Sequence, residues 1–213
     1  MPYVVGFASQ ARGGKNEAGE YLCKRLNELC SEEWHCASLA RAVKKIFSDN
    51  FGVSTEFIEE WKVKQEIPEG FQLPLRDGLT MIGNDWRKFK SDIWIEKLFK
   101  DNDKNIIVTD VRYFNEVDAI TGKSDLPYMK KYKGVAILLW RPGYENNKQT
   151  ASEQELMPCV RKLEHEHSGF IIDQDIPFDI WLRNNGTLED WYKKIDDIVV
   201  PYVIKKFQLE KKC

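Results

Sequence analysis

The chain has 213 residues, and its 34 acidic and 32 basic side chains give a formal net charge of -2 at pH 7. This length fits one domain, and 42% hydrophobic with 31% charged residues fits a globular protein of the cytoplasm. Because no apolar run approaches the roughly 20 residues that span a bilayer, we expect no membrane partner. The near-neutral net charge produces no electrostatic field that would attract polymeric nucleic acid. The N-terminal segment lacks the features of a signal peptide.

Five scattered cysteines, an odd number, contain no CxxC pair. This pattern predicts neither a disulfide framework nor a zinc site, and we expect reduced thiols. The cysteines are Cys23, Cys30, Cys36, Cys159 and Cys213.

The first half of the chain begins with a β-branched and aromatic run at 3–8, which predicts a strand. A loop of small residues follows, and 15–29 has the composition of a helix. A second short apolar segment covers 34–40, proline and glycine mark an irregular connection at 66–78, and 79–100 predicts two helical pieces.

The second half contains two apolar runs, 105–111 and 134–140, that are typical of strands buried on both faces of a parallel sheet. A last strand is expected at 178–184, followed by a threonine-capped closing helix in which Pro201 introduces a kink. Alternating strands and helices predict an α/β fold with three layers, in which helices cover both faces of a mostly parallel sheet. The polar segment 141–156 is expected to be a mobile lid.

The loop after the first expected strand carries Gly13, Gly14 and Lys15 where a Walker A loop has its closing glycine and lysine. Small residues let backbone N–H groups surround a phosphate, and a lysine at a helix N-terminus adds positive charge. Ser9 replaces the first glycine of the motif, and Asn16 replaces the residue that usually contacts magnesium. The alternative is an ordinary glycine turn with a solvated lysine.

Charged residues also follow the later strands, where open parallel sheets bind ligands. Asp110 lies at the end of the strand at 105–111 and is a candidate to act on magnesium, directly or through water. Arg112, two residues on, is a candidate for the same crevice. Arg141 directly follows the strand at 134–140 and is a candidate to neutralise phosphate charge. The alternatives are a helix-capping aspartate that pairs with an arginine, and a surface arginine.

A second set of basic residues, Lys44, Arg76 and Arg87, lies near Trp86 between the second and third expected strands. Guanidinium groups bind a phosphate dianion in a bidentate manner, so this segment is a candidate site for a monophosphate. Each residue taken alone is also compatible with a solvated basic side chain.

Several separated segments together resemble the bacteriophage-type deoxynucleoside monophosphate kinases. The loop SQARGGKNEAGEYL resembles the nucleotide-binding loop of that family, and VTDVRYFNEVDAI resembles its Asp-Val-Arg-x-x-Asn-Glu stretch. The resemblance continues through LRDGLTMIGNDWRKFKSDIWI, WRPG, SEQEL and FDIWLRNNGTLEDW, and so spans nearly the whole chain.

The resemblance implies a P-loop nucleoside monophosphate kinase fold, as a single domain over 1–213 with a monophosphate-binding insertion at about 41–100 and a lid at about 141–156. It implies phosphoryl transfer from ATP to a deoxynucleoside monophosphate with Mg²⁺ as the metal, and a viral source would place the protein in the host cytoplasm. The implied catalytic residues are Lys15, Asp110, Arg112 and Arg141, and the implied metal ligands are Asn16 and Asp110. The implied ATP-binding residues are Ala11, Arg12, Gly13, Gly14, Lys15, Asn16, Glu17, Asn184, Asn185 and Gly186. The implied monophosphate-binding residues are Lys44, Arg76, Trp86, Arg87, Arg112, Glu116 and Glu153.

Two other functions remain open at this point. One is a P-loop kinase for a small phosphorylated metabolite, because phosphomevalonate-type kinases carry a similar Arg-x-Gly-Lys loop. The other is a nucleotide-binding module that transfers nothing. The sequence leaves open the accepted base, the choice of ribose or deoxyribose, and whether the protein is a monomer or a homodimer.

Overall fold

The computed structural model describes residues 1–64, 66–100, 102–143 and 151–212, without the side chains of 151–153. The chain divides into two compact units, the first made of Met1–Ala37 with Asn102–Cys213 and the second of Ser38–Asp101. The second unit covers the segment in which the sequence predicts a monophosphate-binding insertion, and that binding stays a prediction.

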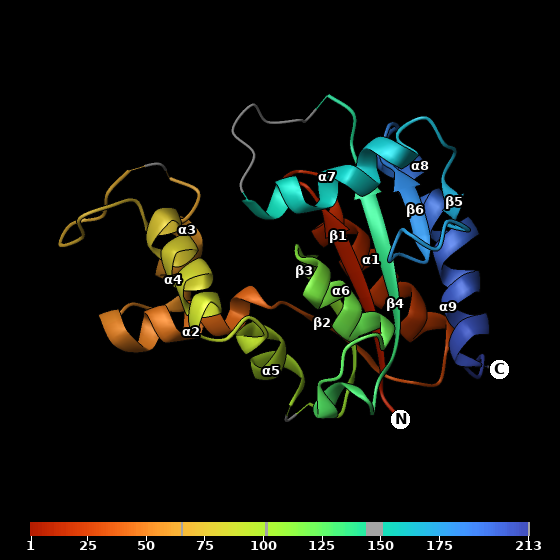
Figure 1. Ribbon diagram of the computed structural model, residues 1–213, viewed down its shortest axis with the longest axis horizontal. Helices are drawn as coiled ribbons and strands as arrows, with labels where there is room; N and C mark the ends of the chain where they lie inside the picture. The colour runs from red at the N-terminus through yellow and green to blue at the C-terminus, as the bar shows by residue number, and fades with distance from the viewer. Residues whose placement is uncertain (65, 101, 144–150, 213) are drawn as a thin grey trace. The chain divides into compact units, whose positions relative to one another are not determined.

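A mostly parallel sheet forms the centre of the first unit (Figure 1). In the described part of the chain it has six strands in the order β2-β3-β1-β4-β6-β5. At one edge β5 pairs antiparallel to β6, whereas the other strand pairs among the described residues are parallel. The predicted α/β class with a mostly parallel sheet is confirmed. The strands are β1 (Tyr3–Ser9), β2 (Trp34–Ala37), β3 (Asn105–Val111), β4 (Lys133–Trp140), β5 (Gly169–Phe170) and β6 (Ile180–Arg183).

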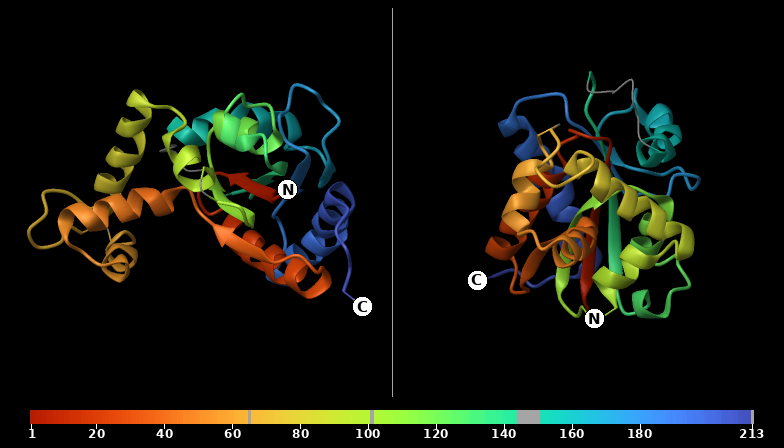
Figure 2. Two further views of the ribbon diagram at one scale, coloured as in Figure 1. Left: turned by 90° about the horizontal axis from the view of Figure 1, so that it is seen from below. Right: turned by 90° about the vertical axis from the view of Figure 1, so that its left-hand side faces the viewer.

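Helices cover both faces of this sheet (Figure 2). One face carries α1 (Lys15–Leu29), α8 (Leu188–Lys194), the π-helical segment η2 (Ile195–Val199) and α9 (Val200–Phe207). The other face carries α6 (Phe114–Thr121) and α7 (Ala151–Leu163), and a short 3-10 helix, η1 (Pro127–Met129), precedes β4. The connections after β1 and β3 therefore leave the sheet on opposite faces, which is the arrangement that opens a ligand site at the carboxyl ends of two adjacent parallel strands.

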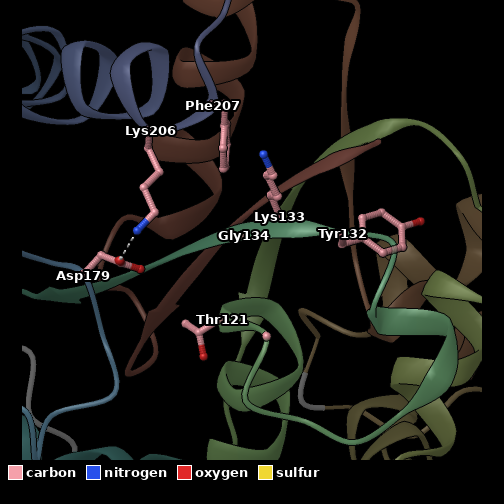
Figure 3. Close-up of a pocket in the computed structure, with 8 residues that line it drawn as sticks. Thr121, Tyr132, Lys133, Gly134, Asp179, Lys206 and Phe207 are labelled. Carbon is pink, nitrogen blue, oxygen red and sulfur yellow. Dashed lines mark ion pairs between the residues drawn. The ribbon is translucent and has the colours of Figure 1, made fainter.

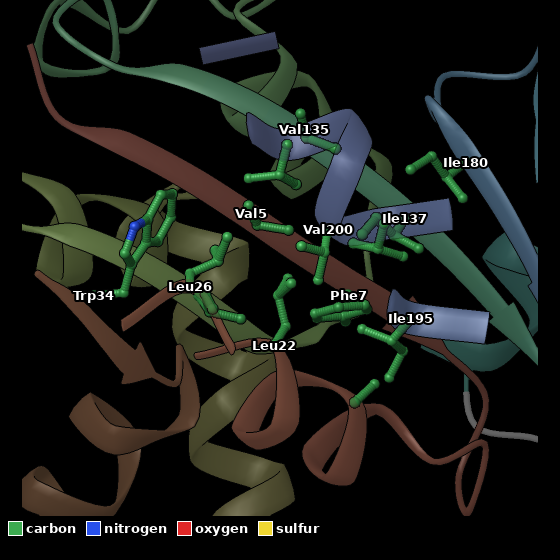
Figure 4. Close-up of a cluster of buried hydrophobic side chains, with 14 of the residues drawn as sticks. Val5, Phe7, Leu22, Leu26, Trp34, Val135, Ile137, Ile180, Ile195 and Val200 are labelled. Atoms are coloured by element: carbon green, nitrogen blue, oxygen red, sulfur yellow. The ribbon is translucent and has the colours of Figure 1, made fainter. Parts of the chain in front are cut away.

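The main core lies between the sheet and α1, α8, η2 and α9 (Figure 4). Val5 and Phe7 point to this face because side chains alternate along a strand, and they pack with Leu22 and Leu26 of α1. Each such side chain, fully buried, contributes about 1.5–3 kcal/mol to folding. The core thus fixes α1 against β1, and the loop between them is held at both ends.

The opposite face requires close approach between α6 and the sheet. A Cβ on Gly6 of β1 would lie 2.5 Å from Cδ1 of Ile120, and one on Gly134 would lie 1.8 Å from the Ile120 carbonyl oxygen. Glycine at these two positions lets the end of α6 rest directly on β1 and β4.

The second unit is helical and has its own small core around Phe47, Ile58 and Leu75. The predicted pair of helices over 79–100 is present, but the first begins earlier, at Leu75 directly after Pro74. Proline is suited to the start of a helix because it has no N–H to satisfy there. The helices are α2 (Ala40–Phe51), α3 (Thr55–Trp61), α4 (Leu75–Phe89) and α5 (Ile93–Phe99).

Two local predictions for the first unit need correction. The segment 141–156 is not a loop throughout, because α7 begins at Ala151, while 144–150 lies outside the described residues. The closing helix is capped by Thr187 as predicted, but a π-helical segment divides it. Pro201 lies in the first turn of α9, directly after that segment, and the kink at Pro201 stays a prediction. Among the described residues, no helix has the length and apolar character needed to cross a membrane.

Candidate functional site

The loop between β1 and α1 folds back on itself. Gly13 donates from its backbone N–H to the carbonyl oxygen of Gln10 at 3.3 Å, while Arg12 and Gly14 have left-handed φ values of 60° and 94°. A Cβ on Gly13 would lie 2.4 Å from Ser9 Oγ. The geometry of the turn therefore requires glycine at positions 13 and 14.

Lys15 turns its ammonium group over this loop. Its Nζ donates to the carbonyl oxygen of Ser9 at 3.0 Å and to that of Gln10 at 3.2 Å. Lys15 is also the first residue of α1, whose N-cap is Gly14. A cation, a helix N-terminus and a turn of small residues thus meet at one point, and all three favour an anion.

The turn after β6 is joined to the same loop. Asn184, 9% exposed, donates from Nδ2 to the carbonyl oxygen of Gly13 at 3.2 Å, and its backbone N–H donates to Trp140 at 2.7 Å. A Cβ on Gly14 would lie 2.7 Å from Asn184 Nδ2. The sequence predicted Asn184 and the two glycines in one nucleotide site, and the structure brings them into contact.

Lys194 holds the rest of this turn. Its Nζ donates to the carbonyl oxygen of Arg183 and to Oδ1 of Asn185, both at 2.7 Å. Burial lowers the pKa of Lys194, the carboxylate of Asp190 acts in the opposite direction, and Arg183 adds to the lowering. A Cβ on Gly186 would lie 2.7 Å from Asp190 Oδ2, so the turn needs glycine there.

A β-bulge occurs in β3 close to Asp110. The pairing of β1 with β3 runs from Gly6 opposite Val108 to Ala8 opposite Val111, so that β3 has one more residue than β1 between these pairs. Bulges re-aim side chains and are frequent beside active sites. Asp110, half-buried, lies within the bulge, at the carboxyl end of a strand adjacent to β1.

Arg112 follows β3 and is exposed. Among the described residues its guanidinium forms no ion pair. The turn that carries it is fixed by Glu116, 1% exposed, whose Oε2 accepts the backbone N–H of Arg112 at 2.7 Å and that of Tyr113 at 3.2 Å. Glu116, which the sequence predicted to bind the monophosphate, therefore acts here as the buried support of Arg112.

Arg141 directly follows β4 and Arg183 is the last residue of β6, so both lie at the same edge of the sheet. The carbonyl oxygen of Arg141 accepts from Gln10 Nε2 at 3.3 Å, which joins the ends of β1 and β4. The Arg183 guanidinium lies over the ring of Trp140, 5.1 Å from its centroid, and its Nε is buried with no hydrogen-bond partner among the described residues. Arg112, Arg141 and Arg183 therefore lie at the carboxyl ends of β3, β4 and β6. Of these strands, β3 and β4 flank β1, and β6 is next to β4.

The remaining predicted ATP-binding residues lie in or next to the loop. Ala11 is half-buried, whereas Asn16 and Glu17 are exposed in the first turn of α1. Glu17 accepts the hydroxyl of Tyr192, and this bond raises the pKa of Tyr192. The ring of Tyr192 stacks on Tyr21 with centroids 4.0 Å apart, which fixes α8 beside the start of α1.

The predicted monophosphate-binding residues fall on both units. Arg112, Glu116 and Glu153 belong to the first unit, and the side chain of Glu153 lies outside those described. The second unit holds Lys44, Arg76, Trp86 and Arg87.

Within the second unit, Arg76 and Arg87 are both on α4. Eleven positions separate them, so at about 100° per residue they share one face of the helix. Trp86 stacks on Trp94 at 5.9 Å, and Lys44 pairs with Glu59 at 2.6 Å.

Sequence reasoning did not identify three residues of this region, Gln10, Glu155 and Arg183. Glu155 accepts the backbone N–H of Phe114 at 2.6 Å and so ties α7 to the start of α6. Arg183 is the last residue of its strand, while Arg112 and Arg141 directly follow theirs, so its position alone was a usable signal. The contacts of Gln10 and Glu155 depend on the folded chain and left no such signal.

A cavity of about 260 Å³ lies at the opposite end of the sheet (Figure 3). Its lining includes Gly122 at the end of α6, Lys133 at the start of β4, and the ion pair of Asp179 with Lys206 at 3.8 Å. These residues flank the amino ends of the strands, whereas the loop of Lys15 lies at the carboxyl ends. The cavity is therefore separate from the candidate site.

The donor set at the site suits Mg²⁺. This ion prefers oxygen ligands, and it commonly takes one or two carboxylates with waters and phosphate oxygens in place of a full protein cage. Asp110 supplies a carboxylate and Asn16 an amide oxygen, while no cluster of three or more metal-binding side chains occurs among the described residues.

Comparison with known proteins leaves the family open. No protein-family model matches the chain, and no curated protein matches it. Among solved structures, an unliganded sugar kinase from Janibacter sp. HTCC2649 is similar at 12% identity and a TM-score of 0.33, over 98% of this chain and 95% of the other. A protein from Chloroflexus aurantiacus j-10-fl, assigned provisionally to the kinases, is similar at 12% identity and a TM-score of 0.43, over 97% of this chain and 96% of the other. Both scores are below 0.5, so neither structure contributes to the argument for function.

Proposed function

We propose that the protein is a kinase that transfers the γ-phosphoryl group of ATP to a deoxynucleoside monophosphate. The observation that carries the proposal is Lys15, whose ammonium group lies over a glycine turn at the N-terminus of α1, 3.0 Å from the carbonyl oxygen of Ser9. Such a loop surrounds the phosphates of a nucleotide, and its lysine reaches the β- and γ-phosphates.

Catalysis at this site rests on position and charge. Phosphoryl transfer requires little covalent chemistry from the protein, so its main contributions are in-line alignment and neutralisation of phosphate charge. Lys15 and the Gly13–Gly14 backbone hold ATP, the turn at Asn184 passes the adenine, and Arg141 neutralises charge from the end of β4. One oxygen of the acceptor monophosphate attacks the γ-phosphorus as the bond to ADP breaks, which yields a deoxynucleoside diphosphate.

The acceptor assignment rests on Arg112 and on the sequence resemblance. Arg112 presents an exposed guanidinium, and a buried carboxylate fixes the turn that carries it. A guanidinium binds a monophosphate dianion with two parallel hydrogen bonds. We assign Arg76 to the same phosphate because it lies in the segment that resembles the monophosphate-binding insertion.

Mg²⁺ is the proposed metal, held by Asp110 and Asn16 directly or through water. When bound, it neutralises negative charge on the phosphate oxygens. Asp110 would orient it from the bulged end of β3, while Asn16 would do so from the first turn of α1.

An assay of ADP release tests the proposal. Purified protein is incubated with ATP, Mg²⁺ and single acceptors from a panel of deoxynucleoside monophosphates, ribonucleoside monophosphates and small phosphorylated metabolites. The Lys15→Ala variant, purified in parallel, controls for a contaminating kinase. We expect ADP and a deoxynucleoside diphosphate only with the wild-type protein and a deoxynucleoside monophosphate.

The same assay separates the two alternatives. Release of ADP with a phosphorylated metabolite and with no nucleoside monophosphate would support the metabolite kinase. ATP binding by calorimetry without ADP release on any acceptor would support a nucleotide-binding module. Either result would contradict the proposed acceptor.

A further inference from the structure

Cys23 and Cys36 face one another across the contact between α1 and β2. Cys23 Sγ donates to the carbonyl oxygen of Trp34, the first residue of β2, at 3.3 Å. In the other direction, Cys36 Sγ donates to the carbonyl oxygen of Gly19, one helical turn before Cys23, at 3.6 Å. Each thiol thus bonds to the element that carries the other.

The contact is held in a fixed register. Asn27 of α1 donates from Nδ2 to the carbonyl oxygen of Trp34 at 3.0 Å and accepts its N–H on Oδ1 at 2.9 Å. About two turns before Asn27 on the same face of α1, a Cβ on Gly19 would lie 2.4 Å from Cγ2 of Thr109, so glycine there lets the helix lie close to β3. The two thiols are therefore carried by elements that are held in a fixed register.

The surroundings of the two sulfur atoms differ. The neighbouring Cys36 thiol lowers the pKa of Cys23, burial opposes this, and the Cys36 backbone and Asn27 Nδ2, the latter at 3.6 Å, add to the lowering. The bond with Cys23 and burial raise the pKa of Cys36, although Cys36 is exposed. One member of the pair is thus suited to attack as a thiolate, and the other is accessible to solvent.

We propose that Cys23 and Cys36 form a reversible redox site, oxidised to an intramolecular disulfide by a small disulfide of the glutathione class. The Cys23 thiolate attacks one sulfur of oxidised glutathione, which breaks the S–S bond and releases one glutathione. Cys36 then loses its proton and attacks the Cys23 sulfur, which forms the internal bond and releases the second glutathione. Two electrons pass from the cysteine pair to glutathione, and its two thiols take up the two protons.

The bond would close the connection from α1 to β2, a segment that leads to the boundary between the two units at Ala37. The proposed disulfide does not depend on the kinase reaction. It would stand even if the proposed phosphoryl acceptor were wrong. Cys30 and Cys159 are buried and lie outside the pair.

Peptide mapping tests this site. The protein carries Cys213→Ser, which removes the thiol that lies outside the described residues, and is equilibrated with oxidised and reduced glutathione at set ratios. Trypsin with Glu-C separates Cys23, Cys30 and Cys36 onto the peptides 21–24, 29–32 and 34–41. We expect a mass loss of about 2 Da in the intact protein, a cross-link between peptides 21–24 and 34–41, and a melting temperature higher by about 5–10 °C.

Three variants separate this bond from other oxidation. Cys36→Ser should stop the reaction at a mixed disulfide on Cys23, with a gain of about 305 Da. Cys23→Ser should form no internal bond, whereas Cys159→Ala should form it as the parent does. Free Cys23 and Cys36 in oxidised protein, a link from either to Cys30, or glutathione on Cys36 alone would overturn the proposal.

Discussion

Asn184 donates from Nδ2 to the carbonyl oxygen of Gly13 at 3.2 Å, although 171 positions separate the two residues. A carboxylate has no N–H to donate, so Asn184→Asp places two acceptors against each other. We expect this variant to lower the free energy of unfolding by about 1–3 kcal/mol and to raise the Kd for ATP at least about tenfold. Urea unfolding and calorimetric titration with ATP measure the two effects.

Asn185→Asp is the matched control for this prediction. Asn185 accepts a hydrogen bond from Lys194 through Oδ1, and a carboxylate oxygen accepts it equally well. We expect a free energy of unfolding close to that of the wild type. Equal losses in both variants would mean that charge near the loop, and not the bond to Gly13, causes the effect.

Gly14→Ala tests the conformation of the phosphate loop. Gly14 has a φ of 94°, and its Cβ would lie 2.7 Å from Asn184 Nδ2. Gly70 has a comparable φ of 83° but nothing within 4 Å of its Cβ, so Gly70→Ala measures the backbone strain alone. We expect about 1–2 kcal/mol of destabilisation at Gly70 and a larger value at Gly14. Chemical denaturation compares them, and a smaller loss at Gly14 would contradict the contact with Asn184.

Lys15→Ala is expected to remove phosphoryl transfer, with turnover at least about 100-fold lower, because the ammonium group neutralises phosphate charge. The side chain is not part of the core, so the melting temperature should change little. Lys24→Ala, on the exposed side of the same helix, should retain full turnover. A folded Lys15→Ala protein with wild-type turnover would refute the assignment of the loop.

Arg76→Lys and Arg112→Lys address the acceptor phosphate. Lysine keeps the charge but loses the bidentate geometry, so each variant should lose at least about tenfold in kcat/KM for the monophosphate, roughly 1.4 kcal/mol. The KM for ATP should change little, and Arg161→Lys, an exposed position on α7, should have no effect. Weaker ATP binding with unaltered monophosphate kinetics would assign that arginine to the other nucleotide.

Glu116→Ala tests the support of Arg112. The change leaves the backbone N–H groups of Arg112 and Tyr113 without their acceptor, so the free energy of unfolding should fall by about 1–3 kcal/mol. If the carboxylate also positions Arg112, the KM for the monophosphate rises while that for ATP stays constant. Glu189→Ala, an exposed glutamate in the first turn of α8, is the control. An unchanged monophosphate KM in a folded Glu116→Ala protein would limit Glu116 to a structural role.

The sequence predicted the centre of the sheet because its strands are continuous apolar runs. The expected strand at 105–111 has the bounds of β3, and the helix expected at 15–29 has those of α1. Since parallel strands end at one edge, Asp110, Arg112 and Arg141 could also be placed together with the loop of Lys15. Their roles in binding stay predictions.

Features that depend on pairing between distant segments could not be predicted in this way. The bulge near Asp110 depends on the register of β3 with β1, and the bond from Asn184 to Gly13 depends on the whole sheet. Although SEQEL resembles the helix that follows the lid of the family, the apolar pattern alone did not reveal the start of α7. Its first residues are polar, although Leu156 and Val160 behind them have helical spacing and are buried.

The strand order has a consequence for association between copies of the chain. The sheet ends at β2, which has four residues, and at β5, which has two. Long, flat edge strands expose rows of unpaired backbone groups on which another chain can add a strand, and short edges limit this addition. The long strands β1, β3 and β4 all lie inside the sheet with a neighbour on each side. The arrangement that gathers the phosphate loop and the arginines therefore also protects the protein from edge-to-edge aggregation.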